Sequence, residues 1–131
     1  PVEIKKHLDE YIAARQQAAL YYDKAFAGHP KIQTPVVASH TTHVFHQYTL
    51  KLTNVDRFRL IENMKEVGVP VMIYYPVPLH LQKAFAHLGY EKGDFPVAEA
   101  LCDCVVSLPM HTELDEEQLK YITDNFIRFI D

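Results

Sequence analysis

Apolar residues recur along the chain with periods that predict helices at both ends and short strands between them. In residues 3–27 they fall at steps of three, four and seven, which places Ile4, Leu8, Ile12, Ala19, Tyr22 and Phe26 near one helix face. Gly28 would end this helix, and Pro30 would prevent it from resuming. Roughly 25 residues make about 37 Å of helix. A domain of this size needs less for its own core, so we expect the helix to bridge to something else.

The clearest strand signal lies in residues 42–52, which are rich in β-branched and aromatic residues. Alternation along a strand places one set of side chains on one face, namely Val44, His46, Tyr48, Leu50 and Leu52. Shorter strands are predicted at 71–75 and 105–108. Residues 31–39, which surround Pro35, predict an irregular edge strand.

Four further segments predict helices. Asn54 can cap a helix that runs to Val67, and its apolar residues at steps of three are Phe58, Ile61 and Met64. Asp115 and Gln118 have the spacing of a capping box at the start of the last helix. The apolar stripe of that helix is Leu119, Ile122, Phe126, Phe129 and Ile130. The other two helices are expected over 79–88 and 97–104.

This order of elements predicts an α+β fold. We expect a small, mostly antiparallel sheet of three or four strands with helices packed on one side, because the connections between the strands are short.

Composition narrows the class of protein. The chain has 131 residues, of which 48% are hydrophobic and 23% charged, as in one soluble domain. Its net charge of −4 gives no basic footprint for nucleic acid. No apolar run approaches the roughly 20 residues that span a bilayer, and no signal peptide is visible. The two cysteines, Cys102 and Cys104, lie too close for an easy disulfide. We therefore expect a reducing, cytoplasmic setting.

Most candidate chemical groups have a structural explanation. His40, His43 and His46 are spaced three apart, but the last two lie in a predicted strand, where that spacing points side chains to opposite faces. A metal site is therefore not expected. Three acidic residues, Asp94, Glu99 and Asp103, have the spacing of an exposed helix face. Cys102 lies on the apolar face of the same predicted helix, where a cysteine is usually a core residue.

The best candidates for a binding site are Tyr74, Tyr75 and His80. Both tyrosines end an apolar run, and Pro76 and Pro78 then stop strand pairing because proline has no N–H to donate. Adjacent residues of a strand face opposite ways, so burial can explain at most one of the two tyrosines. His80 lies on no obvious apolar stripe. His111, which follows another proline, is a weaker candidate.

Four stretches of the chain resemble a known family. They are His7–Arg15, His43–Tyr48, Gly68–Gln82, and Phe95–Glu99 together with Ser107–His111. All four resemble the C-terminal small domain of the DegT/DnrJ/EryC1/StrS sugar aminotransferases. The run from Gly68 to Gln82 is the most specific part, and the resemblance covers nearly the whole chain.

The resemblance implies a fold-type I enzyme that uses pyridoxal phosphate to move an amino group, usually from glutamate, onto a keto carbon of a nucleotide-linked sugar. Such reactions serve the synthesis of cell-surface polysaccharides and related glycans. The cofactor and its lysine would belong to a large N-terminal domain that precedes residue 1. Residues 1–28 would then be the connector helix and residues 29–131 the small domain, which would be inactive alone. The abrupt start at Pro1, with no Met, agrees with this picture.

The resemblance also implies site residues. Tyr74 and Tyr75 fall where relatives place sugar-nucleotide contacts, often as His-Tyr, and His80 follows in the same motif. The family's active site lies at a dimer interface, so a homodimer is implied, with no membrane or nucleic-acid partner. The form of the motif leans toward amination at C3. The alternative is a free-standing module that binds nucleotide sugars, or another partner, without catalysis.

Overall fold

A computed structural model describes residues 2–130, with side chains described from His7 to Ile130. Its α-helices are α1 (Val2–Ala25), α2 (Arg57–Glu66), α3 (Pro96–Cys104) and α4 (Glu116–Ile130). Its strands are β1 (Ile32–Gln33), β2 (Tyr48–Leu52) and β3 (Val105–Leu108). Two 3-10 helices, η1 (Leu79–Leu81) and η2 (Lys83–Leu88), precede α3.

The strands form a three-stranded antiparallel sheet in the order β1-β2-β3, so the predicted α+β fold is confirmed. Tyr48 pairs with Leu108, and Leu50 pairs with Val106. Directly opposite residues of an antiparallel pair share a face, and all four of these side chains are buried. This face of the sheet therefore builds the core.

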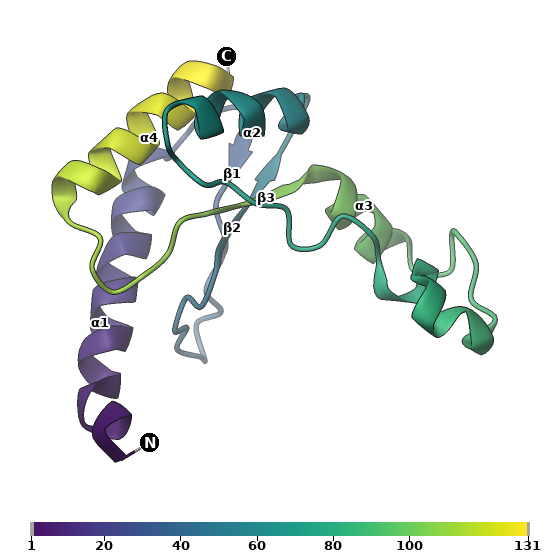
Figure 1. The fold of residues 1–131 in the computed structure, drawn as a ribbon, viewed down its shortest axis with the longest axis horizontal. Coiled ribbons are helices and arrows are strands. Elements are labelled where there is room, and N and C mark those ends of the chain that lie inside the picture. The colour runs from purple at the N-terminus through teal and green to yellow at the C-terminus, as the bar shows by residue number, and fades with distance from the viewer. Residues whose placement is uncertain (1, 131) are drawn as a thin grey trace.

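Helices from both ends of the chain cover that face. Helices α1 and α4 pack together, and α2 packs on α4 (Figure 1). The ring of Tyr22 on α1 lies 4.9 Å from that of Tyr48, and the rings of Phe26 and Phe126 lie 5.4 Å apart in an edge-to-face contact. These aromatic contacts fix the long helix to the sheet and to the last helix.

Residues 74–104 form an arm that extends from this body (Figure 1). The arm carries η1, η2 and α3 and then returns to the sheet as β3. None of the residues of α3 is buried. None of the helices in the part of the chain that the structure describes is both long and apolar enough to cross a membrane.

Predicted strands proved shorter than their sequence patterns. Within residues 42–52, regular pairing begins only at Tyr48, because Phe45 adopts a positive φ of 48°. That conformation breaks the alternation, so Phe45 is buried while Val44 and His46 are exposed. The predicted face was therefore wrong for these residues. Of residues 71–75, only Met72 pairs, through an isolated bridge to Ser107.

Helix boundaries also differ from the pattern. Helix α2 is capped by Asp56, whose side chain accepts a hydrogen bond from the Arg59 amide, and not by Asn54. The helix buries Arg57, Leu60 and Met64, whereas Phe58 is exposed. In contrast, the capping box of α4 is confirmed: Asp115 and Gln118 each bind the other's backbone amide. Extended backbone at Gln82 divides the predicted helix 79–88 into two 3-10 helices.

Candidate functional site

Tyr74 and Tyr75 lie at the base of the arm, where the chain leaves the sheet. Met72 makes the last backbone pairing, with Ser107, and the peptide bond between the two tyrosines is cis. Their ring centroids lie 5.8 Å apart in an edge-to-face contact, and the side chains are 39% and 68% exposed. Neither tyrosine faces the core, because strand alternation ends with the pairing, so burial explains neither of them. Both rings are available at one exposed site.

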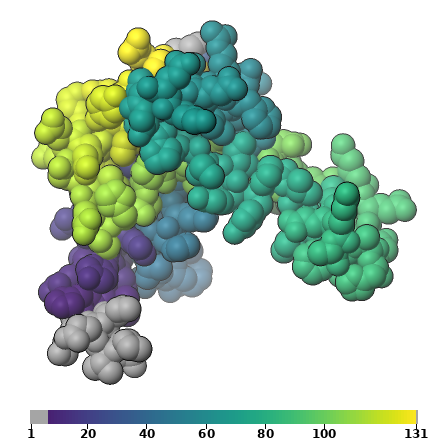
Figure 2. All heavy atoms as spheres, in the orientation of Figure 1, coloured from purple at the N-terminus to yellow at the C-terminus, as the bar shows by residue number. Residues whose placement is uncertain are grey.

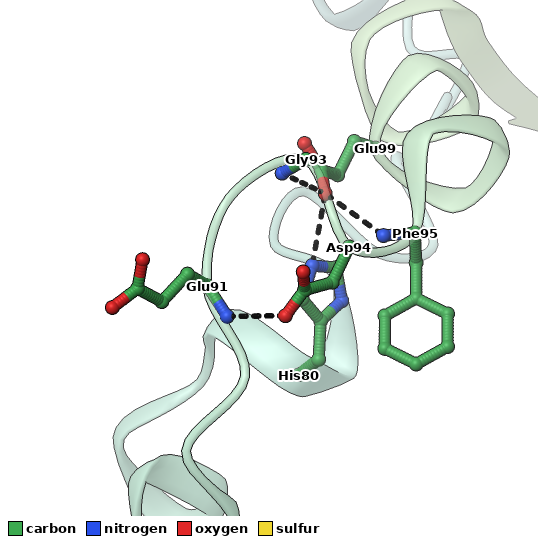
Figure 3. A network of polar contacts seen from close by, with 6 residues as sticks. All are labelled: His80, Glu91, Gly93, Asp94, Phe95 and Glu99. Atoms are coloured by element: carbon green, nitrogen blue, oxygen red, sulfur yellow. Dashed lines mark hydrogen bonds and ion pairs between the residues drawn. The ribbon is translucent and has the colours of Figure 1, made fainter.

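His80 is held inside the arm. It lies on η1 and is only 9% exposed. Its Nε2 atom lies 3.0 Å from Oε1 of Glu99, and its ring centroid lies 4.8 Å from that of Phe95 (Figure 3). A histidine with these contacts has a fixed ring orientation.

Glu99 joins three parts of the arm through one carboxylate oxygen. Besides His80, that oxygen accepts hydrogen bonds from the backbone amides of Gly93 at 2.8 Å and Phe95 at 3.4 Å (Figure 3). The Gly93 amide, followed by His80 and the Phe95 amide, lowers the pKa of Glu99 below its ordinary value, because these donors favour the carboxylate. Only 14% of the side chain is exposed. The prediction of an exposed acidic face was therefore wrong for Glu99.

Tyr75 and His80 share a cavity of about 360 Å³. Its remaining lining residues are Val77, Pro78, Leu79, Gln82, Phe95, Ala98 and Cys102. A second cavity, of about 450 Å³, also contacts Tyr75 and extends to Lys83. Figure 2 shows that the arm bearing these residues projects from the body. Apolar walls with a few polar groups suit an organic ligand that has a ring and hydroxyl groups.

The other histidine candidates lie elsewhere. The Nδ1 atom of His43 accepts the Phe45 amide at 2.9 Å, and the two rings lie 4.4 Å apart. His111 contributes to a different cavity, of about 470 Å³, between residues 68–70 and the start of α4. Within the described residues, no group of His, Cys, Asp and Glu side chains could hold a metal ion.

Sequence reasoning missed the roles of Glu99 and Phe95. Phe95 is the N-cap of α3, but its side chain cannot accept a hydrogen bond from the helix, and Pro96 has no amide to offer. Glu99 reaches back to the Phe95 amide in the manner of a capping box. A glutamate four residues after an N-cap that cannot itself cap the helix was the available signal.

Comparisons with known proteins agree on one family. The model of the DegT/DnrJ/EryC1/StrS aminotransferase family matches residues 5–127. A "Pleiotropic regulatory protein" from Geobacillus stearothermophilus is 39% identical over 94% of this chain and 33% of its own. A UDP-N-acetyl-3-dehydro-alpha-D-glucosamine 3-aminotransferase from Acidithiobacillus ferrooxidans is 40% identical over 88% of this chain and 30% of its own.

The fold agrees as well. The crystal structure of DesV from S. venezuelae, in complex with a ketimine intermediate, superposes with a TM-score of 0.89 at 31% identity. That match covers 96% of this chain and 33% of DesV. The chain therefore belongs to the DegT/DnrJ/EryC1/StrS aminotransferase family, and it spans about a third of the length of these relatives.

The residues that line the cavity bear on which kind of ligand it could take. No lysine lines the cavity that Tyr75 and His80 share, and Lys83 of the adjoining cavity is exposed. A pyridoxal cofactor is held by a lysine, with further groups for its ring nitrogen and its phosphate. The residues around Tyr75 do not make such a set.

Proposed function

We propose that this chain is the C-terminal small domain of a pyridoxal-phosphate-dependent aminotransferase that aminates a keto sugar linked to a nucleotide. The single observation that carries the proposal is the family match over residues 5–127. The exposed tyrosines beside an apolar cavity support it, because they suit a sugar nucleotide. Residues 1–28 are assigned to the connector helix and residues 29–131 to the small domain.

In this proposal the cofactor serves as an electron sink in the remaining part of the protein. The residues of this chain bind and orient the sugar nucleotide. The hydroxyl of Tyr75 can donate a hydrogen bond to a sugar hydroxyl or a phosphate oxygen, and its ring can stack on a flat group. His80 lines the same cavity. Tyr74, which does not line the cavity, supports the Tyr75 ring through their edge contact.

Further parts of the proposal concern the reaction partners. Glutamate is the amino donor, and the protein is a cytoplasmic homodimer whose product enters polysaccharide or related glycan synthesis. Amination at C3 is favoured, since the name of the relative from Acidithiobacillus ferrooxidans specifies a 3-aminotransferase.

Locating the cofactor tests this proposal. The full-length gene product is incubated with pyridoxal phosphate, reduced with borohydride to fix the cofactor on its lysine, and mapped by peptide mass spectrometry. We expect the labelled lysine to lie outside the 131 residues of this chain. A labelled lysine within the chain, or a full-length protein that retains no cofactor, would contradict the proposal.

A free-standing module that binds nucleotide sugars is the alternative. It is favoured by one observation: the residues that line the Tyr75 cavity include no lysine. Under this alternative, the 131-residue chain alone binds nucleotide sugars in titration calorimetry. Absence of binding by the isolated chain, together with amination by the full-length product, would exclude it.

A further inference from the structure

Glu99 holds together the walls of the Tyr75 cavity without lining the cavity itself. It bonds to the His80 ring and to the backbone of Phe95, and both of those residues are part of the wall. Its bond to the Gly93 amide also ties down the loop that leads into α3. One partly buried carboxylate therefore connects η1, this loop and the first turn of α3.

The bond from His80 also selects a tautomer. An ionised carboxylate can only accept hydrogen bonds, so the hydrogen between the two side chains lies on Nε2 of His80. In a neutral imidazole, Nδ1 is then the acceptor. Glu99 thus fixes both the orientation of the ring and which of its nitrogen atoms can accept a hydrogen bond.

We propose that Glu99 is the positioning residue of this site: its carboxylate fixes the His80 tautomer and the Phe95 wall, so that the Tyr75 cavity is formed before a sugar nucleotide binds. The kinetic consequence rests on the proposed function, whereas the effect on the His80 ring does not. When the walls of a site are already ordered, binding does not have to pay the entropy cost of ordering them, so the affinity is higher.

Glu99→Gln in the full-length protein tests the proposal, because the amide keeps the shape of the side chain and can donate as well as accept. Histidine labelled with ¹⁵N reports the tautomer by NMR, and His80→Asn assigns the His80 signal. We expect the wild-type ring to carry its hydrogen on Nε2 and the Glu99→Gln ring to lose that preference. Glu91→Gln, an exposed glutamate in the same arm, is the matched control and should leave the His80 signal unchanged.

Kinetics give the second readout. We expect Glu99→Gln to raise the KM for the sugar nucleotide about tenfold, a factor in the range that a hydrogen bond to a charged group provides, and to leave the half-reaction with the amino donor unchanged. An unchanged His80 tautomer, or equal losses in both half-reactions, would overturn the role of Glu99. A full-length protein that aminates no sugar nucleotide would overturn the proposed function instead, and the His80 spectrum would still decide the role of Glu99.

Discussion

The guanidinium of Arg57, at the start of α2, donates a hydrogen bond to the backbone carbonyl of Val105, the first residue of β3, at 2.8 Å. The same nitrogen donates to the carbonyl of Cys102 at 3.0 Å. Arg57 is only 9% exposed. From the body of the domain it therefore satisfies one of the last carbonyls of α3 and the first carbonyl of β3, at the point where the arm returns to the sheet.

Arg57→Ala should destabilise the domain by about 2–3 kcal/mol, because the buried Val105 carbonyl and the part-buried Cys102 carbonyl lose charge-assisted hydrogen bonds. Urea denaturation followed by circular dichroism measures the loss. The exposed neighbour Arg59 provides the control, and Arg59→Ala should stay within about 0.5 kcal/mol of wild type. Equal effects of the two substitutions would show that Arg57 does not anchor the arm.

Tyr48→Phe should cost about 1–3 kcal/mol of folding stability. The Tyr48 hydroxyl, on a fully buried residue, donates to the carboxylate of Asp23 on α1, which would lose this partner. Thermal or urea denaturation measures the change against Tyr90→Phe, which alters a half-exposed tyrosine of the arm. If Tyr48→Phe were as mild as Tyr90→Phe, the contact between Tyr48 and Asp23 would contribute nothing to stability.

Alkaline pH should weaken the fold through its buried phenols. Burial raises the pKa of Tyr22 and Tyr48 far above the ordinary value of about 10, and the Asp23 carboxylate raises that of Tyr48 further. A raised pKa favours the protonated phenol in the folded state, so this contribution is complete below pH 10 and is lost as the pH rises above it.

Absorbance of tyrosinate during an alkaline titration checks this prediction. We expect exposed tyrosines to ionise first, while Tyr22 and Tyr48 ionise only as circular dichroism shows unfolding. Ionisation of all eight tyrosines in one step near pH 10, with the fold intact, would contradict it.

Tyr75→Phe in the full-length protein should weaken binding of the sugar nucleotide by about 0.5–1.5 kcal/mol, the contribution of one hydrogen bond. The ring remains, so stacking is retained and only the hydroxyl is lost. Tyr90→Phe, on the same arm but outside the cavity, is the control. Unchanged KM and kcat for Tyr75→Phe would refute the assignment of Tyr75.

Local rules predicted the elements whose causes lie close in the sequence. Helix α1 followed its periodicity in its second half, where Ala19 and Tyr22 are buried, whereas Leu8 is exposed and the side chain of Ile4 lies outside the described residues. Helix α4 began at its capping box because both partners lie within one turn. Strand β2 began later than predicted because Phe45, at a positive φ, turns its ring into the core, a choice made by tertiary packing.

The candidate site likewise combines features that local sequence predicts with features that only the tertiary fold decides. Pro76 and Pro78 indicated that the strand ends beside Tyr75 and leaves its ring exposed. The ring of Tyr75 is exposed, in agreement with that interpretation. The partner of His80 lies 19 residues further along the chain, and no local pattern links the two positions. The sequence therefore predicted an exposed position for Glu99, because the contact between α3 and η1 is formed only in the tertiary structure.

The measurement that most directly tests the central claim is amino transfer by the full-length gene product. The protein is loaded with pyridoxal phosphate and given glutamate with a panel of nucleotide-linked 3-keto and 4-keto hexoses, and the products are identified by mass spectrometry. The account predicts an amino sugar nucleotide from a 3-keto substrate. A full-length protein that holds its cofactor and yields no amino sugar from any member of the panel would contradict it.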